Sequence, residues 1–355
     1  MKIAFVSTGS RIDFFPPKQG AIEQLEFDLI NALKQRNHEI QLFASFPENQ
    51  ENSVSIGSKK IPIDRLHNFY SMLNCFMKRN QLDSDIVHAH YPLTALPFLG
   101  KKPLVYSEHN WYNLKGMNFH STAFTPFFNL IQKKVYEKAD KIIALSSEMK
   151  QHFLQKKVPE EKIELIPNFV DAQKFAPKKK QKNSILFAGR LEKEKRLDLL
   201  LHSLQGKKGY ALTIAGNGSQ LQEMQNLAKN LGINADFLGF VSRKKMPVLF
   251  ASHSVFVLPS DFEAMSLAVL EAMSSECCII ASNAFGVQEQ INNFRNGFIF
   301  DKGSIEQLSN ALDLVLDDSN LCSKLGKNAR QKVLKEFDSK VIAERMEKVY
   351  ESIIH

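Results

Sequence analysis

Short apolar runs alternating with amphipathic segments are the feature that most constrains the fold of this chain. In its first half, the runs "KIAFVS", "EIQLFA", "DIVHAHY", "PLVYSEH", "KIIALS" and "KIELIPN" have the length and composition of buried strands. Segments with helical periodicity lie between them, the first from Ile22 to Lys34. This alternation predicts a parallel sheet covered by helices on both faces.

The same pattern starts again after a break. The stretch "PNFVDAQKFAPKKKQKN" has prolines, a lysine run and no sustained apolar period, so it predicts a linker near Pro167 to Asn183. A chain of 355 residues is long enough for two cores. We therefore expect an α/β protein with two doubly wound, Rossmann-like domains, residues 1–168 and 183–335, that face each other across a cleft. Residues 336–355 form an amphipathic helix that would cap either domain or cross back to the first.

Composition excludes several classes of protein. The chain is 44% hydrophobic and 24% charged, which is typical of a soluble globular protein. It has no apolar run of roughly 18 residues, and its first apolar stretch is too short for a signal peptide. We therefore expect a cytoplasmic location. The cysteines, Cys75, Cys277, Cys278 and Cys322, lack the spacing of metal ligands, so we expect buried reduced thiols and no metal.

Positive charge is spread over the chain. The net charge of +8 is shared by the two halves, which argues against a nucleic-acid-binding arm. Most lysine clusters fit solvated helix faces. The segment "FTPFFNLIQKKVYEKADK" also places aromatic residues beside lysines, as an interfacial helix does. We therefore also consider an anionic membrane surface, at the inner face of the membrane, as a partner of this chain.

The stretch "AGRLEKEKRLDLLL" is the first candidate for binding chemistry. Arg190 and Lys195 follow a buried strand and precede a helix, where cations and free amides can bind phosphate. The alternative is a solvated turn in which Glu192 and Glu194 neutralise these cations.

Two glycine-containing loops also follow strands. Gly216, in "IAGNGSQL", belongs to half of a dinucleotide fingerprint, but the third glycine and the acidic residue for ribose are absent. A tight turn between strand and helix is the preferred interpretation. Gly20, in "PPKQGAI", would let the backbone approach a ligand, or it belongs to a surface loop.

Three histidines lie at the ends of strands in the first half. His109, in "VYSEHNWY", lies at the carboxyl edge of the predicted sheet, where it would be either catalytic or structural. His88 and His90 alternate on one strand, and no third ligand nearby indicates a metal.

The stretch "DFEAMSLAVLEAM" contains two carboxylates in an apolar setting. Glu263 is expected in the loop after a strand, and Glu271 about a turn and a half into a helix that Ser266 caps. Sugar hydroxyls would satisfy both carboxylates without neutralising them, and the amides of residues 265 to 267 would face phosphate oxygens. A buried salt bridge between Glu271 and a lysine is the alternative.

Taken together, these features resemble the retaining glycosyltransferases of family 4, which have the GT-B fold. The resemblance runs from Met1 to about Phe300. It is carried by Gly20, "EHN" around His109, "ADKIIALS", "KIELIPNFVD", "AGRLEKEK", "LTIAGNG", "FLGFVSRKKMPVLFASHSVFVLPS", the pair Glu263 and Glu271, "EAM" and "NGFIF". The Glu-x7-Glu spacing is the specific signal among them.

The resemblance implies a role for each site residue. Arg190 and Lys195 would bind the donor's diphosphate, Glu271 its ribose and Glu263 its sugar. His109 would line the active site, and Gly20 would approach the diphosphate through its backbone. Gly216, Met265, Ser266 and Leu267 complete the implied donor-binding set. No cofactor or metal is implied, because the cations stabilise the leaving group.

The sequence departs from the family pattern at several positions. Ala264, Met265 and Ser266 replace glycine, phenylalanine and glycine, which leaves the donor sugar open. Arg196 stands where the family has glycine.

The resulting expectation is a retaining hexosyltransferase. It would move a hexose or N-acetylhexosamine from a nucleotide diphosphate sugar, with UDP-sugar as the expected donor, to a glycan, glycolipid or other carrier. The alternatives are a nucleotide-sugar epimerase or hydrolase of the same fold and a non-catalytic sugar-nucleotide-binding protein. A dehydrogenase is disfavoured by the incomplete fingerprint.

Overall fold

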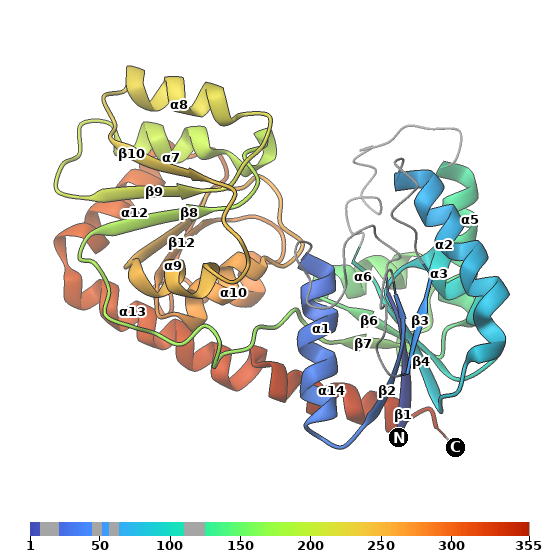
Figure 1. The fold of residues 1–355 in the computed structure, drawn as a ribbon. Coiled ribbons are helices and arrows are strands. Elements are labelled where there is room, and N and C mark those ends of the chain that lie inside the picture. Colours follow the sequence, from blue (N-terminus) through green and yellow to red (C-terminus); the bar gives the residue numbers. More distant parts are fainter. Residues whose placement is uncertain (8–20, 45–51, 57–63, 110–124, 355) are drawn as a thin grey trace. The chain divides into compact units, whose positions relative to one another are not determined.

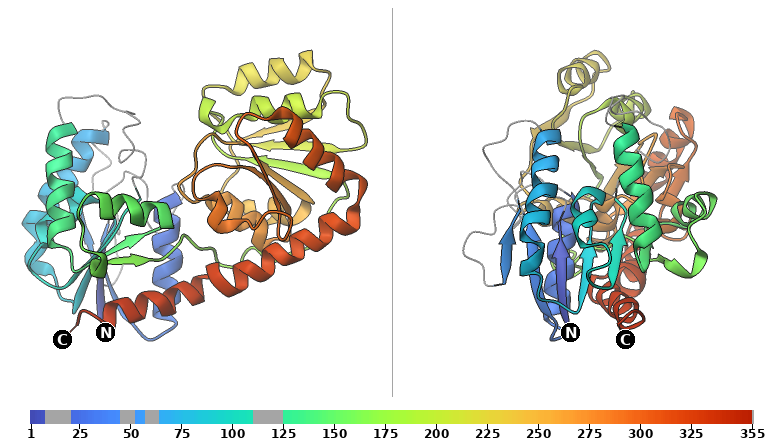
Figure 2. Two further views of the ribbon diagram at one scale, coloured as in Figure 1. Left: turned by 180° about the vertical axis from the view of Figure 1, so that it is seen from behind. Right: turned by 90° about the vertical axis from the view of Figure 1, so that its right-hand side faces the viewer.

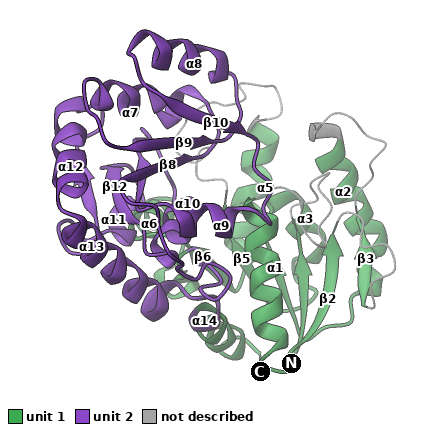
Figure 3. Ribbon diagram, turned by 60° about the vertical axis from the view of Figure 1, so that its left-hand side comes forward, with its two compact units in different colours: residues 1–167, 342–355 green, residues 168–341 purple. Residues whose placement is uncertain are grey.

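The computed structural model describes residues 1–7, 21–44, 52–56, 64–109 and 125–354. It divides into two compact units (Figures 1 and 3), unit 1 with Met1–Pro167 and Ile342–His355, and unit 2 with Asn168–Val341. Each unit is built on its own parallel sheet. The prediction of two doubly wound α/β domains is confirmed.

Unit 1 has a seven-stranded sheet with the order β3-β2-β1-β4-β5-β6-β7. Its strands are β1 (Lys2–Val6), β2 (Glu39–Ala44), β3 (Ser53–Ser55), β4 (Ile86–Ala89), β5 (Leu104–Ser107), β6 (Lys141–Ala144) and β7 (Ile163–Leu165). Its α-helices are α1 (Ala21–Lys34), α2 (Asp64–Lys78), α3 (Pro92–Ala95), α5 (Thr125–Lys138) and α6 (Ser147–Gln155), with short 3-10 turns η1 (Arg79–Gln81), η2 (Leu96–Phe98) and η3 (Glu160–Lys162).

Every residue of the central strands β4 and β5 of unit 1 is buried. Strands covered on both faces read as continuous apolar runs, which is why the sequence pattern located them. Because β1, β4 and β5 are neighbours in a parallel sheet, the residues that follow them share one edge. That edge carries Ser7, His90 and His109.

Unit 2 has a six-stranded parallel sheet with the order β10-β9-β8-β11-β12-β13. Its strands are β8 (Ser184–Ala188), β9 (Ala211–Ala215), β10 (Ala235–Gly239), β11 (Val255–Leu258), β12 (Cys278–Ser282) and β13 (Phe298–Phe300). Its helices are η4 (Lys193–Lys195), α7 (Leu197–Leu204), α8 (Leu221–Asn230), α9 (Met246–Ser252), α10 (Leu267–Ser274), α11 (Val287–Gln290), α12 (Ile305–Asp317), α13 (Ser319–Lys332), the π-helical turn η5 (Val333–Phe337) and α14 (Ser339–Glu351), which continues into unit 1.

Helices cover both faces of the unit 2 sheet (Figure 2). Side chains of α7, α8, α12 and α13 pack on one face, and those of α9 and α10 pack on the other. The strand order reverses between β8 and β11, and ligands of such sheets bind at the carboxyl ends of the strands at this point. The loops that follow β8 and β11 are therefore the first place to look for a site.

The segment expected as a linker belongs to unit 2. Phe169, Val170, Ala172 and Phe175 are buried, and three of them join the core beneath α10. Val170 also forms an isolated bridge with Asp338. This packing could not be predicted from the sequence, because the apolar residues are spaced irregularly between prolines and lysines.

The last residues of the chain pack on unit 1. The Tyr350 hydroxyl lies 2.7 Å from Nδ1 of His88, and Oε1 of Glu347 lies 2.9 Å from Nε2 of His38. Arg345 donates to the carbonyl of Leu165.

All four cysteines are free and buried, as expected from the sequence. Within the residues described above, no helix combines the length and apolar character that a membrane crossing requires.

Candidate active site

The loop between β8 and α7 carries the two predicted phosphate-binding cations. Lys195 closes the 3-10 turn η4, and α7 begins at Leu197, two residues later. Arg190 is largely exposed and forms an ion pair with Glu194 at 2.9 Å. Glu192 accepts bonds from the amide and hydroxyl of Ser219, which hold the pKa of Glu192 below its ordinary value. Of the two proposed carboxylate partners, the structure therefore pairs only Glu194 with Arg190.

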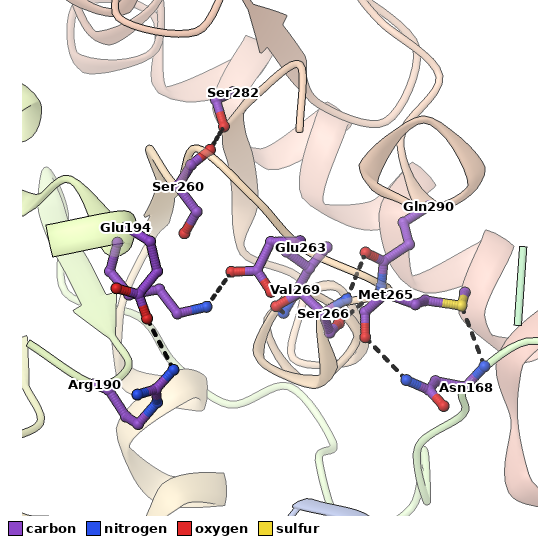
Figure 4. Close-up of polar contacts among 11 residues, drawn as sticks. Asn168, Arg190, Glu194, Ser260, Glu263, Met265, Ser266, Val269, Ser282 and Gln290 are labelled. Atoms are coloured by element: carbon purple, nitrogen blue, oxygen red, sulfur yellow. Dashed lines mark hydrogen bonds and ion pairs between the residues drawn. The ribbon is translucent and has the colours of Figure 1, made fainter. Parts of the chain in front are cut away.

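Lys195 and Glu263 meet at the switch point of the sheet. Nζ of Lys195 lies 2.5 Å from Oε1 of Glu263, and their side chains are only 12% and 9% exposed. In Figure 4 this contact is the dashed line that ends on the carboxylate of Glu263. The two residues follow neighbouring strands, β8 and β11, which brings them together across 68 positions of sequence. A charged pair so sheltered from water interacts more strongly than a surface pair.

The loop that carries Glu263 is clamped by Gln290 of α11. The Ser266 amide donates to Oε1 of Gln290 at 3.2 Å, and Nε2 of Gln290 donates to the Ser266 carbonyl at 2.8 Å (Figure 4). Ser266 also caps α10 as predicted, since its hydroxyl accepts from the Val269 amide. The Ser266 amide was expected to be free to donate to a phosphate oxygen. It donates instead to Gln290, so this expectation is wrong for Ser266.

Other contacts fix the backbone just before Ser266. Asn168 donates its side-chain amide to the Met265 carbonyl at 2.9 Å and its backbone amide to the Met265 sulfur at 3.1 Å. Gly286 packs so tightly under this loop that a Cβ there would overlap the carbonyl oxygen of Ala264. The Met265 side chain is buried in the core, whereas Leu267 is half-buried at the start of α10.

Glu271 lies in the second turn of α10, as predicted. Its side chain is 2% exposed and forms an ion pair with Arg243, from the loop between β10 and α9. Arg243 also lies over the ring of Phe175, 5.5 Å from the ring centroid. The alternative of a salt bridge is therefore partly right, but its cation is arginine instead of lysine.

Gly216 has a packing role in the turn after β9. Its φ of +151° is rare for residues with a side chain, and a Cβ would overlap the Gly189 carbonyl. The Gly189 amide in turn donates to the Ala215 carbonyl at 3.0 Å. The turn after β9 thus supports the loop that carries Arg190.

Arg196 adopts a conformation that favours glycine. Its φ and ψ are +49° and +44°, in the left-handed region that costs a non-glycine residue roughly 1–2 kcal/mol. The guanidinium bridges Asp198 at 3.0 Å and Asp261 at 3.2 Å. Together with Lys193, these residues line a solvent-accessible pocket of about 370 Å³.

His109, in unit 1, is half-buried and lies at the end of a row of polar side chains whose other members, His90 and Glu26, are buried. Its Nε2 lies 3.0 Å from Nδ1 of His90, whose Nδ1 lies 3.8 Å from Oε1 of Glu26. Burial lowers the pKa of His109 to about 4 and that of His88 to about 3, and it raises the pKa of Glu26 well above its ordinary value. His109 is therefore neutral near pH 7. This state suits a hydrogen-bonding role better than that of a charged acid.

Gly20 lies outside the described residues. In the described part of the chain, no group of three or more His, Cys, Asp or Glu side chains has the arrangement of a metal site.

Two family models match the chain along most of its length. "Glycosyl transferases group 1" matches residues 169–332, which include Arg190, Lys195, Glu263 and Glu271, and "Glycosyltransferase Family 4" matches residues 22–174. The chain belongs to the group 1 glycosyltransferases. The predicted family is thereby confirmed, and the Lys195–Glu263 pair lies within the region matched by the first model.

Three known proteins show how far this glycosyltransferase resembles others. It is 29% identical to an undecaprenol-diphosphate-linked glycan α-1,4-N-acetylgalactosaminyltransferase of Campylobacter jejuni, over 69% of this chain and 67% of that protein. It is 27% identical to the UDP-Gal:α-D-GlcNAc-diphosphoundecaprenol α-1,3-galactosyltransferase of Escherichia coli, over 81% and 79%. HepE of Anabaena, solved with UDP-glucose, matches with 19% identity and a TM-score of 0.78, over 99% of this chain and 100% of HepE. That likeness shows the fold, GT-B.

Sequence reasoning missed the residues that hold the predicted site residues in place. Arg243, Gln290 and Asn168 each reach their partners from distant parts of unit 2. Two of them lie in stretches that carry the family resemblance, Asn168 in "KIELIPNFVD" and Arg243 in "FLGFVSRKKM", but no role was predicted for either. Gln290 lies in none of the quoted stretches.

Proposed function

We propose that this glycosyltransferase moves a hexose or N-acetylhexosamine from a UDP-sugar, with retention of the anomeric configuration, to a lipid-linked or other glycan acceptor. The observation that carries the proposal is the sheltered pair of Lys195 and Glu263 at the switch point of unit 2, beside the helix that holds Glu271. Two of the similar proteins support a UDP donor, since one is named for UDP-Gal and the other was solved with UDP-glucose.

In this proposal, the cations of the β8–α7 loop bind the donor's diphosphate. Lys195 leaves Glu263 and binds a phosphate oxygen. Arg190, which is largely exposed, can likewise leave Glu194 and bind a second phosphate oxygen. Negative charge develops on the diphosphate as the bond to the anomeric carbon breaks, so these cations stabilise the transition state more than the bound donor.

The carboxylates hold the two ends of the donor. Glu263, released from Lys195, accepts hydrogen bonds from the sugar hydroxyls, and Glu271 accepts bonds from the ribose hydroxyls while it stays paired with Arg243. Met265, Ser266 and Leu267 lie between these carboxylates in sequence, and Gly216 and Gly20 complete the proposed donor-binding set.

Retention is proposed to follow because the acceptor hydroxyl attacks the anomeric carbon from the same face that the diphosphate leaves. The acceptor hydroxyl forms its bond to the anomeric carbon while the bond to the diphosphate breaks, and a phosphate oxygen receives the hydroxyl proton. His109, with its pKa lowered to about 4 by burial, would contribute a neutral hydrogen bond to the reacting sugar. We propose that the reaction uses no metal or other cofactor, because Arg190 and Lys195 supply the positive charge.

The acceptor is proposed to be lipid-linked because both similar transferases are named for undecaprenol-diphosphate acceptors. Unit 1 has a surface that fits this class of acceptor. The outer face of α2 exposes Phe69, Leu73 and Met77 at helical spacing, and α5 exposes Phe127 and Leu130. Both helices pack on α3 (Figure 1).

Charge on α5 matches an anionic membrane. Lys133, Lys134 and Lys138 lie on the exposed side of α5, beyond Phe127 and Leu130. Apolar side chains beside lysines allow a helix to lie in the membrane interface. We therefore propose a peripheral location at the cytoplasmic face. Co-sedimentation with vesicles containing anionic lipid tests this, and Phe127→Ser with Leu130→Ser should reduce the bound fraction.

A donor screen tests the reaction itself. Wild-type protein is incubated with UDP-, GDP- and ADP-sugars, with and without undecaprenol-diphosphate-linked glycans, and free nucleotide and extended glycan are measured. Acceptor-dependent release of UDP is expected. Turnover without any acceptor would indicate the epimerase or hydrolase alternative, and saturable binding with no turnover would indicate a sugar-nucleotide-binding protein.

A further inference from the structure

We propose that Arg196 is a positioning residue for the donor site: its bridge to Asp261 sets how Lys195 and Glu263 face each other. This inference rests on the proposed function, in which Lys195 and Glu263 contact the donor.

The bridge itself is a forked contact. Nη1 of Arg196 donates to both oxygens of Asp261, at 3.2 and 3.4 Å. On its other side, Nε and Nη2 donate to Asp198 at 3.1 and 3.0 Å. Only the Asp261 contact links the two loops, because Asp198 lies two positions along the chain from Arg196, so it is the contact with Asp261 that sets the direction from one loop to the other.

The bridge lies next to the proposed donor-binding residues on both loops. Arg196 directly follows Lys195, and Asp261 precedes Glu263 by two residues. The Asp261 amide also donates to the Glu194 carbonyl at 2.8 Å. Three links therefore join the two loops within a few residues: this backbone bond, the Arg196–Asp261 pair and the Lys195–Glu263 pair. Breaking the second link should change the geometry of the third.

Stability does not explain an arginine at this position. Glycine would adopt the left-handed conformation of residue 196 without strain. The side chains of Arg196 and Asp261 are 26% and 44% exposed, and exposed ion pairs contribute little to stability. What the arginine adds over glycine is the link to Asp261, which glycine cannot make.

Three variants separate positioning from folding. Arg196→Gly keeps the backbone conformation and removes the bridge, and Asp261→Asn removes the partner charge. Asp198→Asn is the matched control, because it removes the guanidinium's other partner, which lies in the first turn of α7 and not on the loop of Asp261. For Arg196→Gly and Asp261→Asn we expect kcat to fall about tenfold, with the UDP dissociation constant and the melting temperature nearly unchanged. The double variant should be no slower than the slower single variant.

Crystal structures of wild type and Arg196→Gly without ligand provide a readout that needs no activity. The 2.5 Å contact of Lys195 with Glu263 should be lost in Arg196→Gly and kept in Asp198→Asn. An unchanged contact in Arg196→Gly, unchanged kcat in both single variants, or equal losses in all three would overturn the positioning role. If wild type transferred no sugar at all, the proposed function would fail, while the crystal structures would still decide whether Arg196 positions the pair.

Discussion

Lys195 and Glu263 form a 2.5 Å ion pair where β8 and β11 end side by side. Each is a charged group in a sheltered position, and each is the other's partner in the absence of ligand. In the proposed function, donor binding would replace this contact by a phosphate oxygen at Lys195 and by sugar hydroxyls at Glu263, so neither charged group would lack a partner. Such an exchange would let the site hold charged groups near a core without a large free-energy penalty.

The first prediction concerns Lys195. Lys195→Ala should lower the rate of transfer about 100-fold or more, because a charge that stabilises the leaving diphosphate is lost. Lys193→Ala is the matched control, since Lys193 is exposed in the same 3-10 turn. Both are assayed with saturating UDP-sugar. Equal activity in the two variants would exclude Lys195 from the diphosphate site.

Arg243→Met tests the ion pair between Arg243 and the buried Glu271. The methionine keeps the apolar contact over Phe175 but removes the cation beside a carboxylate that is 2% exposed. We expect a loss of about 1–3 kcal/mol in unfolding free energy. Lys244→Met, at an exposed neighbour, should have no such effect. Thermal unfolding measures both, and adding Glu271→Gln to Arg243→Met should recover part of the loss.

Gln290→Ala tests the clamp on the Glu263 loop. It leaves the amide and carbonyl of Ser266 without their partner, which should cost about 1–3 kcal/mol and lower the melting temperature by several degrees. The matched control is Gln288→Ala, at an exposed position of α11. Similar melting temperatures for the two variants would show that the clamp is not needed to hold the loop.

The buried histidines predict an acid-sensitive unit 1. In the unfolded chain, histidine gains a proton as the pH falls through about 6.5, whereas folded His109 does so only near 4. Between these values the unfolded chain binds more protons, so stability falls as the pH falls. Glu26 acts in the opposite sense, because its raised pKa makes its contribution shrink as the pH rises.

His109→Asn should therefore lose less stability than wild type between about pH 7 and about pH 5, by about 1 kcal/mol or more. Melting temperatures of both proteins at the two pH values give the comparison. Replacement of the exposed His202 by Asn is the control and should behave like wild type. If His109→Asn lost as much stability between these pH values as wild type does, the imidazole of His109 would already gain its proton in the folded protein near pH 6.

Most of the fold was predictable because the strands are buried on both faces. Such strands are continuous apolar runs, and they were located in both units. The edge strand β3 was missed, since Ser53, Val54 and Ser55 include a single apolar residue. The segment from Pro167 to Asn183 was predicted as a linker, because its buried apolar residues, among them Phe169 and Phe175, follow no period.

The predicted site residues were recognised from local motifs, whereas the contacts that hold them in place were not. Lys195, Glu263 and Glu271 lie in stretches whose spacing resembles a known family. Gln290 reaches Ser266 across 24 residues, and Asn168 reaches Met265 across 97. No local sequence rule links residues that far apart, so these contacts became visible only in the folded chain.

The most direct test of the donor site is a calorimetric titration of UDP into wild type and Glu271→Ala. If Glu271 binds the ribose hydroxyls, wild type should bind UDP and the variant should bind it about 10- to 100-fold more weakly, the loss expected for hydrogen bonds to a charged group. Glu276→Ala, outside the proposed site, should match wild type. An unchanged dissociation constant in Glu271→Ala would contradict the account of unit 2 as the donor-binding domain.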